Sequence, residues 1–153
     1  MRRQERALAA DAALKIVQEG TWGVLSTVSP LGEPYGVPLN YVYDATDNSI
    51  VFHCAREGKK LENIRATPAV SFTITAYETL VPQKFTTYYE SAILSGQAVL
   101  IEDAAEKARL LTLLCDRLAP EAAHRDSAIE NSLSVTAVCK ISISALTGKR
   151  NGG

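Results

Sequence analysis

The sequence predicts an α+β fold in which about six mainly antiparallel strands curl into a barrel flanked by about three helices. The chain has 153 residues, the usual size of one domain. The first predicted strands are joined by connections too short to hold the crossover helices of a parallel sheet. Antiparallel strands in this number usually close into a barrel, because closure removes exposed edges. We therefore expect one domain over residues 1–150 and a frayed tail over residues 151–153.

The N-terminal third begins with a helix and continues as strands. Leu8, Ala12 and Ile16 recur at helical spacing, which predicts a helix over residues 5–19 that ends at Gly20. β-Branched and aromatic residues then predict strands separated by polar turns. The strands expected here cover residues 21–28, 35–43 and 50–54.

The remainder of the chain mixes helices with longer strands. A short helix is expected over residues 58–66, and a longer one is expected from an N-cap at Asp103 to Pro120. Glu106, three residues after Asp103, completes a variant of the capping box. Gly96 predicts a bend or bulge in the longest strand. The strands expected here cover residues 69–76, 85–101 and 135–143, with a loop over residues 77–84.

Composition argues against several classes of function. The chain has 16 Lys and Arg against 17 Asp and Glu, and this balance disfavours nucleic-acid binding through a basic surface. No apolar run approaches the roughly 18 residues of a membrane helix, and no signal-peptide core follows the basic N-terminus. Three cysteines without a CxxC pair exclude a disulfide scaffold, and two histidines exclude a multi-histidine metal centre. We expect a cytoplasmic protein with no nucleic-acid partner, no membrane segment and no metal.

The strongest candidate for a binding site is residues 53–60, with the sequence HCAREGKK. It joins a predicted strand end to a predicted helix start, where free backbone N–H groups and a partial positive charge favour an anion. Gly58 allows close approach and the pair Lys59-Lys60 adds two cations, so the segment predicts a phosphate cradle. The alternative is a solvated helix start in which Arg56 pairs with Glu57.

Two further clusters lie in predicted strands. Residues 34–41 (PYGVPLNY) hold two prolines and a glycine, which are costly in a fully paired strand. They suit a strand whose backbone lies along a ligand, or alternatively an edge strand that avoids aggregation. Residues 85–91 (FTTYYES) crowd hydroxyls and aromatic rings, which could flank a planar ring or alternatively form a half-buried strand.

Covalent catalysis by a cysteine is not indicated. His53 and Cys54 are adjacent, and adjacent strand residues point to opposite faces, so they do not form a thiolate–imidazole pair. Cys115 and Cys139 lie on predicted core faces and are expected to be inert. No pair of carboxylates stands out as an acid–base system. No GxGxxG motif follows a strand, so a dinucleotide domain is not expected.

Taken in this order, the clusters resemble a known family. The matching stretches are GVLSTVSPLGEPYGVPLNYVYD, IVFHCAREGKKLENIRATPAVSFT, VPQKFTTYYESAILSGQAVLIED and ALTGKR, within residues 20–103 and 135–150. The chain resembles the pyridoxamine 5′-phosphate oxidase-like flavoproteins with the FMN-binding split-barrel fold, and within them the nitroimidazole-resistance (Nim) group. The resemblance implies a mainly antiparallel six-stranded split β-barrel, a homodimer, and two FMN sites at the subunit interface.

The resemblance also implies which residues contact FMN. The backbone of the second strand runs along the flavin, the end of the third strand and the following loop hold the phosphate, and a polar residue of the long strand approaches the ring. The implied cofactor residues are Gly36, Val37, Pro38, Leu39, Asn40, His53, Cys54, Gly58, Lys59, Lys60 and Ser91. His53 is also the implied catalytic residue, as a proton donor or ring contact, since histidine exchanges protons near neutral pH.

Two departures from the oxidase itself bear on the reaction. The oxidase has an Arg-Lys pair after Ser where this chain has Gly58-Lys59-Lys60, and lysine binds phosphate as a point charge without bidentate geometry. The oxidase's C-terminal substrate segment, with its Trp and Arg, has no counterpart, so oxidation of pyridoxamine phosphate is not expected. The Nim resemblance instead implies an FMN-dependent reductase of a small-molecule electron acceptor, a planar electrophile such as a nitroimidazole.

Other functions stay open from the sequence. A non-catalytic flavin-binding, flavin-storage or redox-sensing protein would use the same cradle. A relative that binds deazaflavin or haem is a third hypothesis. Haem would make His53 a candidate axial ligand but would leave the phosphate cradle without a purpose. The absorption spectrum of the purified protein distinguishes these hypotheses, and reoxidation of reduced flavin by a nitroimidazole separates an enzyme from a binder.

Overall fold

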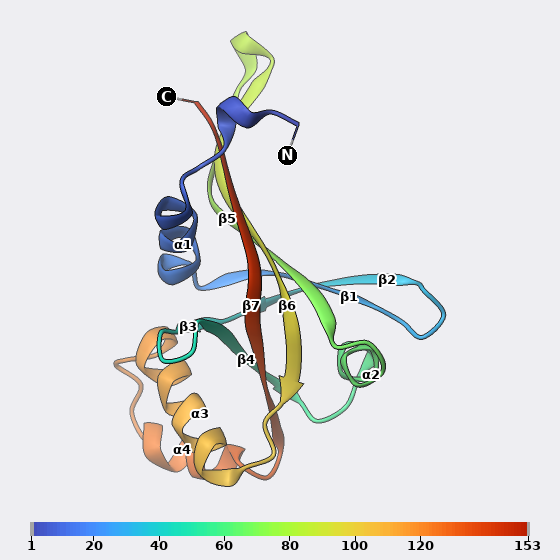
Figure 1. The fold of residues 1–153 in the computed structure, drawn as a ribbon. Helices are drawn as coiled ribbons and strands as arrows, with labels where there is room; N and C mark the ends of the chain where they lie inside the picture. The colour runs from blue at the N-terminus through green and yellow to red at the C-terminus, as the bar shows by residue number, and fades with distance from the viewer. Residues whose placement is uncertain (1, 153) are drawn as a thin grey trace.

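Seven antiparallel strands form one curled sheet in the computed structural model, which describes residues 2–152 (Figure 1). The sheet order is β2-β1-β5-β6-β7-β4-β3. The strands are β1 (Trp22–Val28), β2 (Pro34–Asn40), β3 (Val42–Asp44), β4 (Ser49–Ala55), β5 (Ala69–Val81), β6 (Thr86–Leu100) and β7 (Thr136–Asn151). The helices are α1 (Ala10–Glu19), α2 (Lys59–Ala66), α3 (Ala104–Leu118) and α4 (Arg125–Ser132), with 3₁₀ turns η1 (Gln4–Arg6) and η2 (Pro82–Lys84). The predicted α+β class and antiparallel barrel are confirmed, with one strand and one helix more than expected.

The additional strand arises because the predicted strand over residues 35–43 is divided at Tyr41. The part before Tyr41, β2, pairs with β1, and the part after it, β3, pairs with β4. Tyr41 is fully buried, and its hydroxyl donates a hydrogen bond to the carbonyl of Val17 at 2.8 Å. Its backbone N–H donates to the carbonyl of Thr21 at 3.1 Å. The buried Tyr41 side chain thus redirects the chain from pairing with β1 to pairing with β4. The local residue pattern does not predict this break.

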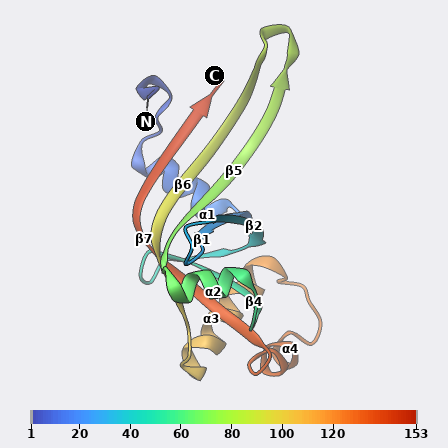
Figure 2. The ribbon, with the colours of Figure 1, turned by 90° about the vertical axis from the view of Figure 1, so that its right-hand side faces the viewer.

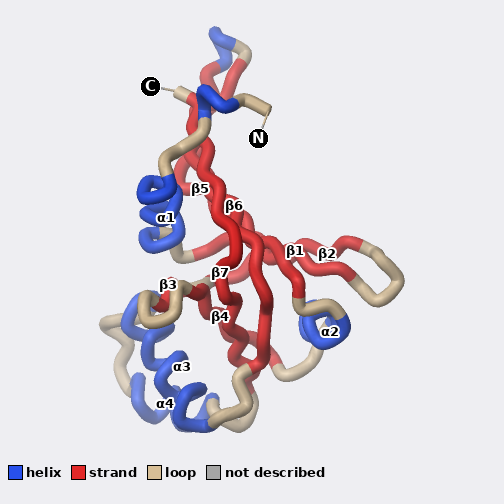
Figure 3. The backbone as a smooth tube through the Cα atoms, viewed as in Figure 1, coloured by secondary structure: helices blue, strands red, loops and turns tan. Residues whose placement is uncertain are grey.

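The additional helix is α4, in a stretch where no helix was expected. His124 precedes it in the left-handed conformation, with φ of 61°. Of the residues in this short helix, Ile129 is the buried one. The helix therefore has no apolar stripe from which the sequence could have predicted it. The helix packs against α3, and both lie on the same side of β4 in Figure 3.

The hairpin of β5 and β6 is longer than predicted and projects from the barrel together with the end of β7 (Figure 2). Residues 77–84, expected to be a loop, continue β5 to Val81 and then form η2. Phe85 closes the turn with φ of 49°. The β5 part of this extension is exposed along most of its length, so it lacks the one-sided alternation that predicts a strand.

The C-terminal strand β7 also exceeds its prediction, since it pairs with β6 as far as Asn151. The Asn151 side-chain amide donates to the hydroxyl of Thr86 at 3.1 Å and to the carbonyl of Thr87 at 2.5 Å. These bonds order the chain at Asn151, where the sequence predicted fraying. Gly153, the last residue of the expected tail, lies outside the described residues.

Gly96 marks an irregularity of the sheet and a close approach of two backbones, as predicted. The register between β6 and β7 shifts between Ser95 and Gly96. A Cβ atom at Gly96 would lie 2.2 Å from the carbonyl oxygen of Ser142 on β7, so the backbones approach more closely here than a side chain permits. The extra residue is Ser144 on β7, and such a bulge increases the local twist, which helps to curl the sheet around its core.

Two apolar cores lie on the two faces of the sheet. The larger fills the barrel and includes Phe72, whose ring meets that of Tyr41 edge-on at 5.1 Å between centroids. The smaller lies between the outer face and the helices α3 and α4, and includes Leu110, Leu114 and Val138. Strand β4 separates the two cores, so its alternate side chains enter different environments.

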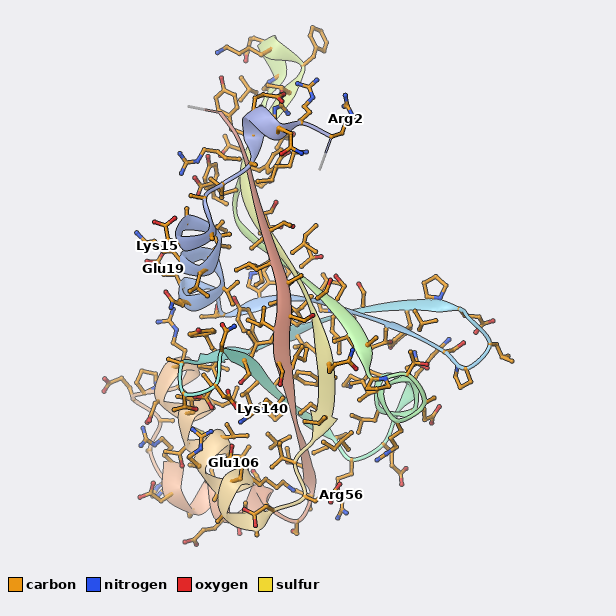
Figure 4. The ribbon with its side chains drawn as sticks, viewed as in Figure 1. Arg2, Lys15, Glu19, Arg56, Glu106 and Lys140 are labelled. Carbon is orange, nitrogen blue, oxygen red and sulfur yellow. The ribbon has the colours of Figure 1, made fainter. Side chains whose placement is uncertain are left out.

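A cluster of charges fastens α3 to the sheet. Asp103 caps the helix as predicted, since its carboxylate accepts from the backbone N–H of Glu106 at 2.8 Å. Arg109 donates to Glu106 at 2.7 Å and to the buried carboxylate of Asp44 at 2.6 Å. Lys140 of β7 donates to Glu106 at 3.0 Å (Figure 4). These contacts hold the helical layer against β3 and β7.

The described residues contain no helix long and apolar enough to cross a membrane. Within the same part of the chain, no group of three or more His, Cys, Asp or Glu side chains could hold a metal ion.

Candidate functional site

The end of β4 and the start of α2 form the candidate site. Gly58 is the N-cap of α2 and has φ of 127°, a conformation that side chains rarely adopt. No side chain caps this helix end. The first backbone N–H groups of the helix therefore stay free for an external acceptor, and the helix dipole adds positive potential at this point. The predicted helix start is confirmed, and its local geometry fits an anion.

Cationic side chains of α2 act on the thiol of Cys54. The pKa of Cys54 lies below its ordinary value, first because the Cys139 thiol donates a hydrogen bond to it, and then because Lys60 and Arg65 stabilise the thiolate. The same contact, together with burial, raises the pKa of Cys139. The barrel side of the β4 end is therefore electropositive, as a phosphate site requires.

Strand β2 reaches the same place from a distant part of the sequence. The Lys59 ammonium lies 3.8 Å from the Glu33 carboxylate and 5.3 Å from the centre of the Tyr35 ring. Asn63, in the middle of α2, is buried and donates to the hydroxyl of Thr27 on β1 at 2.9 Å. The fold thus brings two of the predicted clusters, residues 34–41 and 53–60, to one end of the barrel.

The five predicted residues of β2 alternate along an edge strand. Val37 and Leu39 are half-buried and pack against the barrel core, whereas Gly36, Pro38 and Asn40 are exposed. β2 is the first strand of the sheet order, so one of its edges has no strand beside it. The prolines therefore occupy an edge, as one interpretation of the sequence expected. The same free edge leaves backbone groups accessible to a ligand.

His53 and Cys54 point to opposite faces of β4, as predicted. Cys54 packs against the barrel core, whereas His53 lines a cavity under α3 and α4. Their partners across the β4–β7 ladder are Val138 and Ala137. The two residues cannot form a catalytic dyad. The imidazole of His53 lies on one side of β4 and the thiol of Cys54 on the other.

Ser91 stands apart from these clusters. It lies on β6 between Thr75 of β5 and Lys149 of β7, at the level where the β5 register shifts. Nearby, the Lys149 ammonium lies 5.7 Å from the centre of the Tyr89 ring. The third predicted cluster therefore belongs to the projecting hairpin, and one chain does not bring it to the start of α2.

The structure adds residues that the sequence analysis did not assign to the site. Arg65, near the end of α2, acts on Cys54 through its charge. Its place on the same helix face as Leu61 is the feature of the sequence that could have indicated this role. Cys139 approaches Cys54 through strand pairing that the sequence did not reveal. Arg56 donates to the carbonyl of Ser134 at 2.8 Å. Within the described residues no ion pair joins Arg56 to Glu57, so the expected pairing is not present, while the helix start itself is exposed to solvent.

The fold and this site define a class of protein: a curled antiparallel barrel with an electropositive helix start at one end. A family model for pyridoxamine 5′-phosphate oxidase matches residues 9–150. The chain therefore belongs to the pyridoxamine 5′-phosphate oxidase family. Among curated protein sequences, no match was found.

Solved structures with the same fold support this assignment. One is a candidate 5-nitroimidazole antibiotic resistance protein from Bacteroides thetaiotaomicron, with 25% identity, a TM-score of 0.75, and coverage of 94% of this chain and 85% of that chain. Another is an FAD-binding protein from Mesorhizobium loti, with 23% identity, a TM-score of 0.70, and coverage of 96% and 98%. The flavocytochrome Anf3 of Azotobacter vinelandii has 20% identity, a TM-score of 0.80, and coverage of 100% and 72%. The last two show the likeness of fold alone.

Proposed function

We propose that the chain binds FMN as a homodimer and uses it to reduce small planar electron acceptors such as nitroimidazoles. The observation that carries the proposal is the electropositive start of α2, where uncapped N–H groups, Lys60 and Arg65 converge beside Cys54. The likeness to the nitroimidazole resistance protein supports the acceptor class. The family of the chain supports a flavin rather than another phosphate compound.

The residues at the start of α2 suit a single phosphate. Gly58 leaves open space at the helix end, since an added Cβ would meet no atom within 4 Å. Lys59 extends toward the β1–β2 hairpin and the charge of Lys60 acts on Cys54, so two point charges at the helix start would be available to a dianion. The exposed outer edge of β2, at Gly36, Pro38 and Asn40, would lie along the flavin ring.

His53 would hold a proton on the side of β4 that faces α3 and α4. FMN, when bound, would supply the electron pair for the acceptor. Each conversion of a nitro group to a nitroso group consumes two electrons and two protons and releases one water. Among the predicted cofactor residues, His53 is the one that lines the neighbouring cavity. An imidazole can serve as a general acid or base.

Association of two chains would complete the site. Several large apolar side chains are exposed, among them Trp22 at 53%, Leu80 at 71% and Phe85 at 98%. Exposed apolar groups of this size favour burial against a partner. In a homodimer, Ser91 would approach the flavin bound to the other chain, which accounts for its distance from the start of α2 in its own chain.

The test is the flavin content of purified protein. Wild-type protein should carry close to one FMN per chain, and Lys59→Ala with Lys60→Ala should lose most of it. Lys15→Ala is the matched control, because Lys15 is exposed on α1 and pairs with Glu19 away from this site (Figure 4). Unchanged FMN content in the double variant would reject the cradle. FMN-loaded protein whose reduced flavin is not reoxidised by a nitroimidazole would be a flavin binder and not the proposed reductase.

A further inference from the structure

A small polar pocket lies at the point where β6 leaves β7 and the chain turns toward α3. The two strands pair as far as Leu100 and Cys139, and the backbone N–H of Ile101 then donates to the carbonyl of Val138 at 2.9 Å. The pocket, of about 60 Å³, lies beside this last contact. Residues of the β4–α2 loop, α2, α3 and β7 line it, so the fold assembles it from segments that are far apart in the chain.

Three cationic side chains meet in this pocket. They are Arg56 of the β4–α2 loop, Arg65 of α2 and Lys107 of α3. Thr136 of β7 also lines the pocket, and Glu102 is the one carboxylate among its lining residues in the described part of the chain. Within residues 2–152, none of the three cations forms an ion pair with a carboxylate. The pocket therefore collects three positive charges against one negative charge.

Backbone carbonyls orient two of these cations. The Arg56 guanidinium donates to the carbonyl of Ser134 at 2.8 Å, and the Lys107 ammonium donates to the carbonyl of Leu133. Figure 4 labels Arg56 at this end of the strands. A guanidinium has five N–H donors and an ammonium three, so both side chains have further donors for an external acceptor. A carbonyl is neutral, so these bonds position the cations without compensating their charge.

The charge of the lining favours a dianion. Like charges repel one another, and an anion between them converts the repulsion into attraction. A phosphomonoester carries a charge of about −1.5 to −2 at pH 7 and has three strong acceptor oxygens, whereas a carboxylate carries a single charge. Guanidinium groups also bind phosphate oxygens in a bidentate manner. Three cations and one carboxylate are therefore balanced better by a phosphomonoester than by a carboxylate.

The volume limits what enters the pocket to a compact headgroup. One water occupies about 30 Å³ of the liquid, so about 60 Å³ holds a small oxyanion but not a ring system. Pockets that enclose drug-sized ligands have volumes of about 300–1,000 Å³. Arg56 and Arg65 are exposed, so the pocket is open, and the organic part of a phosphomonoester can extend into solvent.

We propose that this pocket is a second anion site, which binds the phosphomonoester group of a ligand other than the flavin. Neither Lys59 nor Lys60 of the proposed FMN cradle lines it. Arg65 is shared, since its charge also acts on Cys54, whereas Arg56 and Lys107 are not among the residues proposed to hold FMN. The second site therefore stands independently of the proposed function.

The first experiment is a phosphorus NMR titration of the flavin-loaded protein with methyl phosphate. At pH 8 this probe is a dianion, whereas dimethyl phosphate has the same headgroup with a single charge. Methyl phosphate should bind at least fivefold more tightly than dimethyl phosphate, because the loss of one charge removes charge-assisted hydrogen bonds. Equal affinities, or no binding of methyl phosphate, would overturn the proposal.

The second experiment changes the lining of the pocket. Lys107→Gln and Arg56→Gln each remove a charge but keep an N–H donor for the backbone carbonyl, and each should weaken methyl phosphate binding at least fivefold. Lys15→Gln is the matched control, because it removes the same charge from an exposed residue of α1. Glu102→Gln should tighten binding about threefold, a gain that a purely structural role of this carboxylate does not produce. Unchanged affinity in both cation variants would overturn the proposal.

The second site and the proposed function fail in different ways. Loss of FMN from Lys107→Gln or Arg56→Gln would show that the pocket belongs to the flavin, and would overturn the second site. Protein that carries no flavin would reject the proposed function, and methyl phosphate is then titrated into the Lys59→Ala, Lys60→Ala variant. Binding that persists there and is lost when Lys107→Gln is added would support the second site. Binding that is lost with the two cradle lysines alone would overturn it.

Discussion

Asp44→Asn should lower the free energy of unfolding at pH 7 by about 2 kcal/mol. The Asp44 side chain is 2% exposed and accepts from Arg109 at 2.6 Å and from the hydroxyl of Thr46 at 2.7 Å. A hydrogen bond to a charged group contributes about 1.5–3 kcal/mol. The amide can keep the Thr46 contact but not the charge that faces Arg109. Because Arg109 is 41% exposed, water replaces part of the loss, and the lower half of the range applies.

The loss should depend on pH with a definite sign. Burial alone would raise the pKa of Asp44, but the hydrogen bonds from Arg109 and Thr46 outweigh it and hold that pKa below its ordinary value. Hydrogen bonds from Arg109 and Lys140 lower the pKa of Glu106 to about 2. A depressed folded-state pKa stabilises the protein above the unfolded-state pKa of about 4, and this contribution is lost as the pH falls through the folded-state value. The difference between wild type and Asp44→Asn should therefore shrink as the pH falls below about 5.

Urea unfolding followed by circular dichroism at pH 7 and pH 3 measures both effects. In a separate thermal scan at pH 7, the melting temperature of the variant should fall by roughly 4–8 °C for a chain of this length. Asp116→Asn is the matched control, since it removes the more exposed Asp116–Arg125 pair, also at 2.6 Å, and should cost less than about 1 kcal/mol. If Asp44→Asn costs no more than the control, or costs the same at both pH values, the reasoning is wrong.

Three further predictions concern the core and the candidate site. Cys139→Ala should shift the pH profile of Cys54 alkylation to higher pH, because it removes the thiol that lowers the pKa of Cys54; an unchanged profile would contradict that cause. Tyr41→Phe should cost about 1–2 kcal/mol in urea unfolding, because a buried hydrogen bond to α1 is lost, and a cost below about 0.5 kcal/mol would refute it. Glu33→Gln should tighten FMN binding about twofold in a fluorescence titration, because Glu33 competes for Lys59 at 3.8 Å in an exposed pair. That gain should vanish at high salt, and weaker binding would show that Glu33 supports the site.

The parts of the fold that the sequence predicted are those that depend on neighbouring residues. Asp103 as an N-cap, the helix start at Gly58 and the close backbone approach at Gly96 each follow from the chemistry of one short segment, and all three are present. The break at Tyr41 and the helix after His124 were missed. Both depend on packing: a buried tyrosine redirects one strand, and α4 is held by contact with α3 rather than by an apolar stripe.

The candidate site divides in the same way. Cys54 and the lysines after Gly58 lie close together in the chain, so the effect of Lys60 on Cys54 could be predicted from one segment, whereas His53 points to the other face of β4. The contact of Lys59 with residues of the β1–β2 hairpin could not be, since it joins positions far apart in the chain. Ser91 shows the opposite case, because the fold of one chain leaves it on the projecting hairpin.

The sequence by itself determined the class of fold and a strand end that leads into an uncapped, lysine-bearing helix. These features depend on propensity, turn chemistry and local charge, which act between residues close together in the chain. Only the tertiary structure decided what each side of β4 meets: Cys139 lowers the pKa of Cys54 on one side, and α4 covers a cavity at His53 on the other. Strand pairing and side-chain packing join residues that lie far apart in the chain, and no local pattern specifies those partners.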